Sequence, residues 1–321
     1  MGDKGEFAEL KNLKQIYQKE EIQQNTFHLH RKRKQKVFLM LVVIPRDTRI
    51  IRPPRSANCE KTPCAMKTER KTPPISFNVA LPTSWQELTQ EQLLAVFRLM
   101  AYGESGPALM TQAFLIFAGL KPEGEDIYRN RAGFLMKIGV NQITAAALQL
   151  EYLTTVPRAA VRLDHALDGT PCKTGANMED ATFGEFLNAD GLFLQYLNNP
   201  EANADRLEKI AEIFYPGLMP GAARSNYMHA NIILWLTGLK YQLTAMYPHL
   251  FSAKAAPTDY EETAEEVAAR SRRATLSMIR ALTGGDITKE NDILQTAAHS
   301  ALNELNEKAR EAKELEKISK K

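Results

Sequence analysis

The charge balance of this chain changes at Met66, and this change limits where a folded core can form. Residues 1–65 contain 14 Lys and Arg against 7 Asp and Glu, whereas residues 66–321 contain 27 against 31. A basic first part therefore precedes a slightly acidic body, and the net charge of +3 averages the two. Because apolar residues at regular helical spacing lie mostly in the body, we expect residues 66–321 to be the functional unit.

The first part of the chain lacks the pattern of a packed domain. The basic run Arg31–Lys36 precedes eight apolar residues, Val37–Ile44, which are too few to cross a bilayer core that needs about 20. Residues 45–74 are rich in Pro and Arg without periodicity, so we predict a disordered basic leader over residues 1–74. Three interpretations stay open: an electrostatic arm for nucleic acid or membrane, a solvated tail, or an over-long gene start with translation beginning at Met66. We favour the last.

Residues 75–254 have the pattern of a helical body. Ile75–Val79 alternates apolar and polar residues, as a short half-buried strand does. Thr89-Gln90-Glu91-Gln92 is a capping-box sequence, which opens a helix. An Asp-Gly dipeptide within residues 161–174 predicts a small β-hairpin. Apolar periodicity predicts helices near residues 90–102, 108–120, 145–152, 182–197, 202–215 and 226–247. The predicted fold class is therefore mainly α.

The most hydrophobic of these helices, Asn226–Tyr247, is predicted to lie in the core rather than in a membrane. Lys240 interrupts its apolar sequence, and Pro248 ends it. We expect Trp235, at its centre, and Trp85, after the first strand, to be core residues. The sequence thus indicates no membrane partner.

Residues 255–321 predict a C-terminal pair of helices joined at Thr283–Asp286. The second helix, from about Thr288 to Ile318, has apolar residues every three or four positions. Opposite charges four residues apart on its other faces favour a long exposed helix. Two interpretations stay open: a solvated terminal helix, or a helix that docks on a partner or on a second copy. In the second interpretation the hypothesised partner-binding residues are Leu294, Ala298, Ala301, Leu302 and Leu305.

Sequence patterns that carry catalytic chemistry are missing. No Walker-type phosphate loop, dinucleotide-binding glycine motif, His-Glu-x-x-His or Gly-x-Ser-x-Gly sequence occurs. Arg270, Arg272 and Arg273 follow acidic residues that offset them, so nucleic-acid binding is not favoured. We therefore expect no enzyme activity, catalytic residue, cofactor, metal site or small-molecule substrate. The histidines of the body are scattered, and none pairs with a cysteine at ligand spacing: His165, His229, His249 and His299.

Four stretches together resemble a family of uncharacterised proteins encoded by phages and prophages of Bacteroides-type bacteria: Ile75–Leu93, Ala181–Leu197, Asn231–Phe251 and Ile279–Leu315. The resemblance implies a helical protein of the tail module, located in the cytoplasm of the bacterial host, and no catalytic residues. It implies a tail assembly chaperone that shields a tape-measure-type partner, although this chain is longer than usual assembly chaperones. The alternatives are a structural neck or tail component of the mature particle, and a nucleic-acid-binding protein acting through the basic leader.

Overall fold

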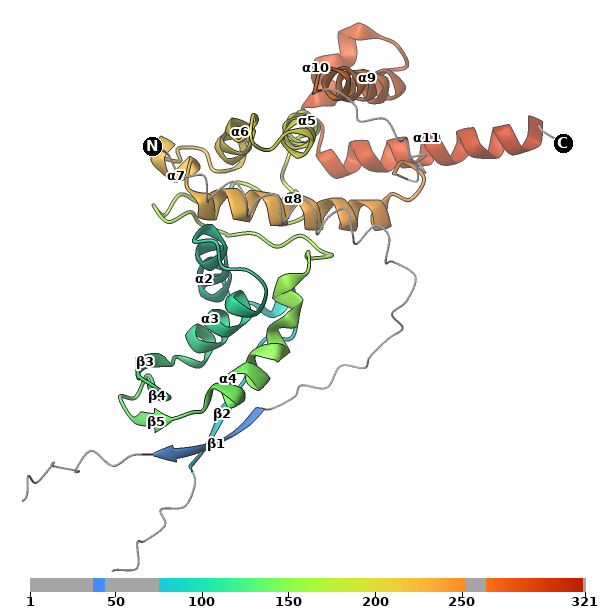
Figure 1. The fold of residues 1–321 in the computed structure, drawn as a ribbon. Helices are drawn as coiled ribbons and strands as arrows, with labels where there is room; N and C mark the ends of the chain where they lie inside the picture. Colours follow the sequence, from blue (N-terminus) through green and yellow to red (C-terminus); the bar gives the residue numbers. More distant parts are fainter. Residues whose placement is uncertain (1–36, 44–74, 252–263, 320–321) are drawn as a thin grey trace, which may run out of the picture.

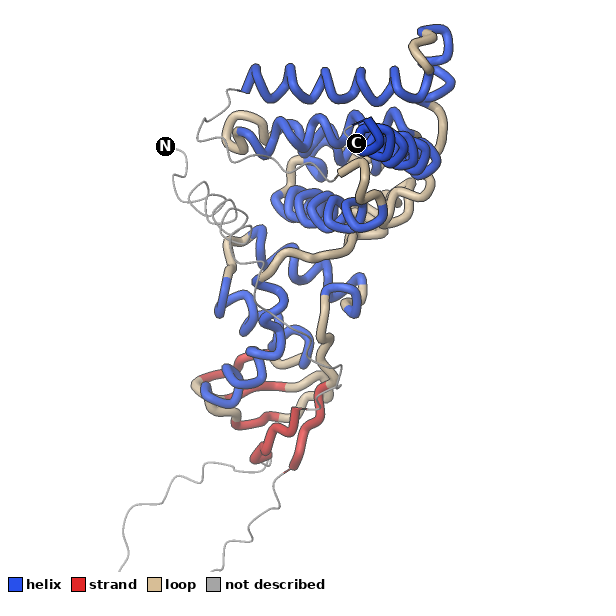
Figure 2. The backbone as a smooth tube through the Cα atoms, turned by 90° about the vertical axis from the view of Figure 1, so that its right-hand side faces the viewer, coloured by secondary structure: helices blue, strands red, loops and turns tan. Residues whose placement is uncertain are grey.

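The computed structural model describes residues 37–43, 75–251 and 264–319 (Figure 1). Over these residues the chain is mainly helical with one antiparallel sheet, which confirms the predicted fold class. Figures 1 and 2 show an elongated molecule in which the helices from α5 onward form an upper layer. Helices α2 to α4 and the sheet form the lower part. No helix among the described residues is long and apolar enough to cross a bilayer.

The sheet at the lower end has the strand order β2-β1-β5-β4-β3. Strand β2 (Ile75–Val79) is the strand predicted from the sequence, and it pairs antiparallel with β1 (Val37–Val43). Strand β1 precedes Met66, so this part of the expected leader joins the sheet; the rest of the leader prediction lies outside the described residues. A run of Val, Leu and Phe favours a strand. The remaining strands are β3 (Lys121–Gly124), β4 (Ile127–Arg129) and β5 (Leu135–Lys137).

Strands β3 to β5 were not predicted, because their sequences carry little strand pattern. Each has only three or four residues, too few to show an alternation of apolar and polar side chains. Strand β3 contains Pro122 and Gly124 and is exposed along its length. Both residue types are depleted in strands. Backbone pairing with β4 therefore defines this strand, rather than its side chains.

Three helices build the lower core together with Trp85. The predicted capping box forms at the start of α2: Gln92 N–H donates to Thr89 Oγ1 at 3.2 Å, and Thr89 N–H donates to Gln92 Oε1 at 3.0 Å. Trp85 is buried, as predicted, and its Nε1 donates to the carbonyl oxygens of Tyr152 and Thr155, each at 3.0 Å. The helices are α2 (Gln90–Ala101), α3 (Gly106–Ala118) and α4 (Val140–Ala147), which leads into a 3₁₀ segment, Leu148–Thr154.

The upper layer is organised around α8, which packs on α2 below and on α6 at its other side. Trp235, near its middle, is fully buried, which confirms the core prediction. Gly238 allows the loop that contains Ala159 to approach α8 closely, because a Cβ added at Gly238 would lie 2.3 Å from the Ala159 carbonyl oxygen. The helices are α5 (Phe183–Asn198), α6 (Asp205–Phe214), α7 (Pro220–Ala223), α8 (Asn226–Met246), α9 (Ala264–Thr283), α10 (Glu290–Leu294) and α11 (Ala298–Ser319).

The hairpin predicted over residues 161–174 is reduced to one bridge, between His165 and Pro171. The Asp-Gly turn does form: Gly169 has a φ of +86°, and Asp168 Oδ1 accepts a hydrogen bond from Thr170 N–H at 3.0 Å. Strands do not extend from it, because side chains of α2 and α8 bind the flanking backbone instead: Asp164 N–H donates to Gln90 Oε1 and Leu163 N–H donates to Asn231 Oδ1, each at 2.9 Å.

The predicted C-terminal helix from Thr288 to Ile318 is interrupted, which corrects the sequence-based expectation. The break lies at Gln295–Ala297, between α10 and α11. There Phe183 N–H donates to the Thr296 carbonyl at 2.8 Å, and Ala298 N–H donates to the Ala181 carbonyl at 2.9 Å. These bonds take backbone groups away from a continuous helix and join the break to the start of α5.

Candidate interaction surface

The five residues assigned to a partner by the sequence lie inside the molecule. Ala298, Ala301, Leu302 and Leu305 are buried, and Leu294 is half-buried against the same core. Helix α11 packs on α5 and α9, and α10 packs on the same two helices. The apolar residues of α10 and α11 therefore pack against helices, but these helices belong to the same chain. These side chains are not available as a partner surface in this structure.

Polar contacts fix the first half of α11 to the end of α8. Tyr247 Oη and His299 Nδ1 are 2.7 Å apart, and His299 Nε2 lies 2.7 Å from the Asn177 carbonyl oxygen. Asn306 is buried, and its Oδ1 accepts hydrogen bonds from the N–H groups of His249 at 2.9 Å and Leu250 at 3.3 Å. These contacts could not be predicted from the sequence, since isolated His and Asn residues carry no periodic pattern.

The second half of α11 is exposed and projects from the upper layer (Figure 1). Arg310 forms ion pairs with Glu307 and Glu314, each at 2.9 Å, which support the helix before it leaves the body. Leu315 and Ile318 follow on this exposed half. Two large apolar side chains three residues apart on a projecting helix are a candidate contact surface.

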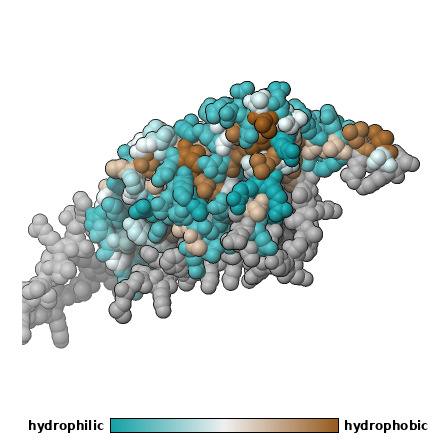
Figure 3. All heavy atoms as spheres, turned by 90° about the horizontal axis from the view of Figure 1, so that it is seen from above, coloured by the Kyte–Doolittle hydropathy of each residue, from teal (hydrophilic) through white to brown (hydrophobic). Residues whose placement is uncertain are grey.

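An open groove of about 520 Å³ runs between α5 and α9. Leu187 and Leu192 contribute apolar surface from α5, and Leu276 does so from α9, where 55 % of this side chain is exposed. Arg272 lines the groove beside Leu276, and Arg273 is exposed nearby. Seen from above, the upper helices present hydrophobic clusters among hydrophilic atoms (Figure 3). The groove therefore combines an apolar lining with a basic edge.

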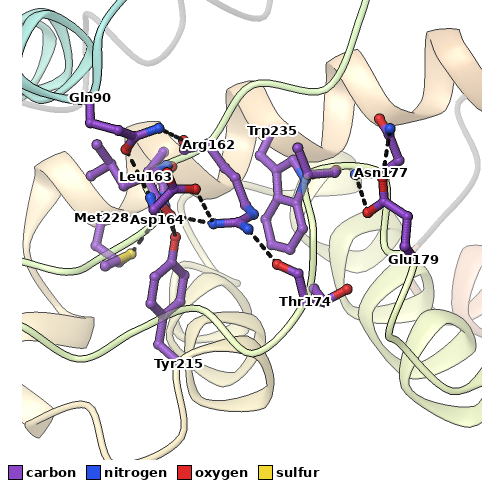
Figure 4. Close-up of polar contacts among 12 residues, drawn as sticks. Gln90, Arg162, Leu163, Asp164, Thr174, Asn177, Glu179, Tyr215, Met228 and Trp235 are labelled. Atoms are coloured by element: carbon purple, nitrogen blue, oxygen red, sulfur yellow. Dashed lines mark hydrogen bonds and ion pairs between the residues drawn. The ribbon is translucent and has the colours of Figure 1, made fainter.

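Arg162 is the centre of a buried polar cluster between α2 and α8 (Figure 4). Its Nη1 donates to the Leu163 carbonyl at 2.8 Å and to Asp164 Oδ1 at 3.0 Å, and its Nη2 donates to the Thr174 carbonyl. The guanidinium carbon lies 5.9 Å from the centre of the Trp235 ring. A buried arginine needs such partners, because desolvation of its charge is costly.

The same cluster continues to α6 and α8 through Asn231. Asn231 Oδ1 accepts from Leu163 N–H at 2.9 Å, and its Nδ2 donates to Tyr215 Oη at 3.0 Å. Tyr215 in turn donates to the Leu163 carbonyl at 2.6 Å. Burial raises the pKa of the Tyr215 hydroxyl and also that of the neighbouring Cys172 thiol, so both stay protonated near neutral pH. These groups hold a loop segment in place, and the geometry assigns them a structural role.

Among the described residues, no three His, Cys, Asp or Glu side chains gather as a metal site requires. Comparison with protein-family models, with curated proteins and with solved structures found no match for this chain.

Proposed function

We propose that this chain is a non-enzymatic interaction protein of a phage tail-assembly module, acting like a chaperone that shields an apolar helical segment of a tape-measure-type partner. The observation that carries the proposal is the open groove between α5 and α9. Grooves between two helices accept the apolar face of a third helix in many complexes. The resemblance of the sequence to a phage family supplies the tail module as the setting.

The chemistry of the groove suits an amphipathic helix with acidic neighbours. Leu276 can contact an apolar side chain of the partner, while Arg272 and Arg273 favour carboxylates beside it. A shielding role needs reversible binding, and a groove that is only partly apolar favours it over a permanent interface.

The projecting half of α11 favours a second candidate, a structural neck or tail component of the mature particle. Leu315 and Ile318 are exposed on it, and a permanent assembly would bury them. Mass spectrometry of purified virions separates the two candidates, because a chaperone is expected to be absent from the particle and a structural component present.

The groove is tested by co-expressing the full chain with the tape-measure and tail-tube proteins of the same phage. Leu276→Asp places a charge in the groove, so we expect it to abolish co-purification of the partner. Leu148→Asp is a matched control, because Leu148 has nearly the same exposed fraction, 56 %, and lies outside the groove. Equal recovery with both variants would reject the groove. Binding of DNA that weakens steeply with salt would instead identify a nucleic-acid protein.

A further inference from the structure

A second hollow lies on another side of α5, between α5 and α8, and has a volume of about 200 Å³. An engineered cavity of about 150 Å³ lined by Leu, Ile and Phe stays dry and accepts benzene in another protein. This hollow therefore has room for one aromatic ring, but it is smaller than the roughly 300–1,000 Å³ typical of sites for whole small molecules. Six buried apolar side chains form its wall: Met178, Phe186, Phe193, Leu236, Leu239 and Leu243.

The mouth of this cavity carries a charged acceptor and a charged donor, and the exposed Thr244 and the half-buried Phe251 also line the cavity. Asp190 of α5 and Lys240 of α8 form an ion pair at 2.5 Å, and both side chains are partly exposed. The Lys240 ammonium lies 6.0 Å from the centre of the Phe193 ring, above the cavity wall. A peptide group also has one donor and one acceptor and no net charge. It can contact both side chains, whereas a charged ligand would meet a like charge at the same mouth.

One residue of the wall, Met178, is held in position by an unusual turn. Met178 has a φ of +60°, a left-handed conformation that is uncommon for residues other than glycine. Two side chains bind the carbonyls just before it: Trp235 Nε1 donates to Ala176 at 2.6 Å, and His299 Nε2 lies 2.7 Å from the Asn177 oxygen. Figure 4 shows Trp235 and Asn177 near this turn. The turn thus presents a buried methionine, whose flexible thioether adapts to a ring.

We propose that this cavity anchors one aromatic side chain of a partner polypeptide, while the adjoining peptide group contacts Asp190 and Lys240. The inference rests on the proposed function, because it requires a polypeptide partner. A buried aromatic anchor in a preformed pocket is a common source of binding energy at protein interfaces. The site lies apart from the α5–α9 groove, so it gives the partner a second contact.

The test titrates the full chain, with labelled Leu and Met methyl groups, with N-acetyl-phenylalaninamide. We expect NMR shifts of the Met178, Leu239 and Leu243 methyls with a dissociation constant on the order of 1 mM. N-acetyl-alaninamide lacks the ring and should cause no shift, and phenylacetate should bind at least about tenfold more weakly because of its charge. Absence of shifts would overturn the proposal. Equal or tighter binding of phenylacetate would also overturn it, in favour of a small-ligand site.

Two variants locate the binding. Leu239→Phe fills the cavity with a ring of the protein itself and should abolish the shifts of the remaining methyls. Lys240→Met removes the donor at the exposed mouth and should weaken binding of N-acetyl-phenylalaninamide by about tenfold. This second variant keeps the test decisive if Leu239→Phe does not fold. Unchanged binding in Lys240→Met would contradict the role of the mouth.

Leu276→Asp, in the other groove, should leave the titration unchanged. If the unmodified chain does not co-purify with the tape-measure or tail-tube protein but does bind N-acetyl-phenylalaninamide, the proposed function is wrong while the cavity still binds an aromatic ring. If it co-purifies with the partner but does not bind N-acetyl-phenylalaninamide, only the proposal for the cavity is wrong.

Discussion

The two halves of α11 have similar sequence patterns but opposite environments. Both halves repeat apolar residues every three or four positions, separated by polar or charged residues. In the first half Leu302 is 1 % exposed, whereas in the second half Leu315 is 67 % exposed. The difference arises because neighbouring elements bury the apolar residues of the first half, whereas residues 311–315 are exposed even though Lys313 Nζ donates to the His249 carbonyl at 2.9 Å. The same sequence pattern is thus buried where other helices pack against α11 and exposed to solvent where α11 projects beyond them.

This comparison also separates the proposed partner-binding surfaces from the five residues that the sequence predicted for a partner. The apolar residues with the clearest helical spacing are already used within the chain. Candidate surfaces for a partner are the α5–α9 groove, the cavity between α5 and α8 and the projecting end of α11.

The largest effect is expected for Leu302→Ala. Removing a fully buried leucine side chain costs its transfer free energy and leaves a cavity, together about 2–5 kcal/mol. Urea unfolding followed by circular dichroism measures the free energy of unfolding. A loss smaller than about 1 kcal/mol would mean that the first half of α11 does not pack on α5 and α9 as the structure has it.

Asn306→Ala should destabilise the fold by about 1–3 kcal/mol. The substitution removes the acceptor for the N–H groups of His249 and Leu250. Asn303→Ala is the matched control, since Asn303 is exposed on the same turn of helix. If both variants unfold at the same urea concentration, the polar contact with the end of α8 does not contribute.

Arg310→Ala, at the border between the two halves, should shift the urea midpoint too little to resolve. Its ion pairs with Glu307 and Glu314 are surface pairs, which contribute little to stability in water. Helical content of the last turns should fall slightly, measured by hydrogen exchange of residues 311–319. A clear loss of overall stability would show that the projecting half supports the body.

The smallest effect on stability is expected for the pair Leu315→Ala with Ile318→Ala. Both side chains are already exposed, so the free energy of unfolding should change by less than about 0.5 kcal/mol. Sedimentation velocity should nevertheless show weaker association if this end contacts a second copy or a partner. Destabilisation comparable with that of Leu302→Ala would remove the distinction between the two halves.

Much of the helical architecture could be predicted from local patterns. The capping-box residues Thr89 and Gln92 predicted the start of α2. The long run of apolar residues in Asn226–Met246 predicted a buried helix. Trp85 and Trp235 were correctly placed in the core. These features follow from residues close in sequence, whose spacing alone defines a helical face or a cap.

Contacts between distant residues could not be predicted in this way. Strand β1 pairs with β2 and β5, which lie much later in the sequence. Asn231 of α8 forms hydrogen bonds with Leu163 and Tyr215, which lie outside that helix. Isolated polar residues such as Asn231 have no periodic pattern, so only the folded chain shows what they bind. The candidate surfaces, a groove and a cavity flanking α5, likewise arise from packing of three helices.

Local sequence patterns were enough to predict a mainly helical chain, the position of its most hydrophobic helix and the apolar face of α11. The folded chain was needed to show that this apolar face packs on other helices of the same chain and that the predicted terminal helix breaks at Gln295–Ala297. The physical reason is that amphipathic spacing specifies a face to be buried without specifying its neighbour. Which helices cover the apolar face of α11, here α5 and α9, depends on the packing and backbone hydrogen bonds of the whole fold.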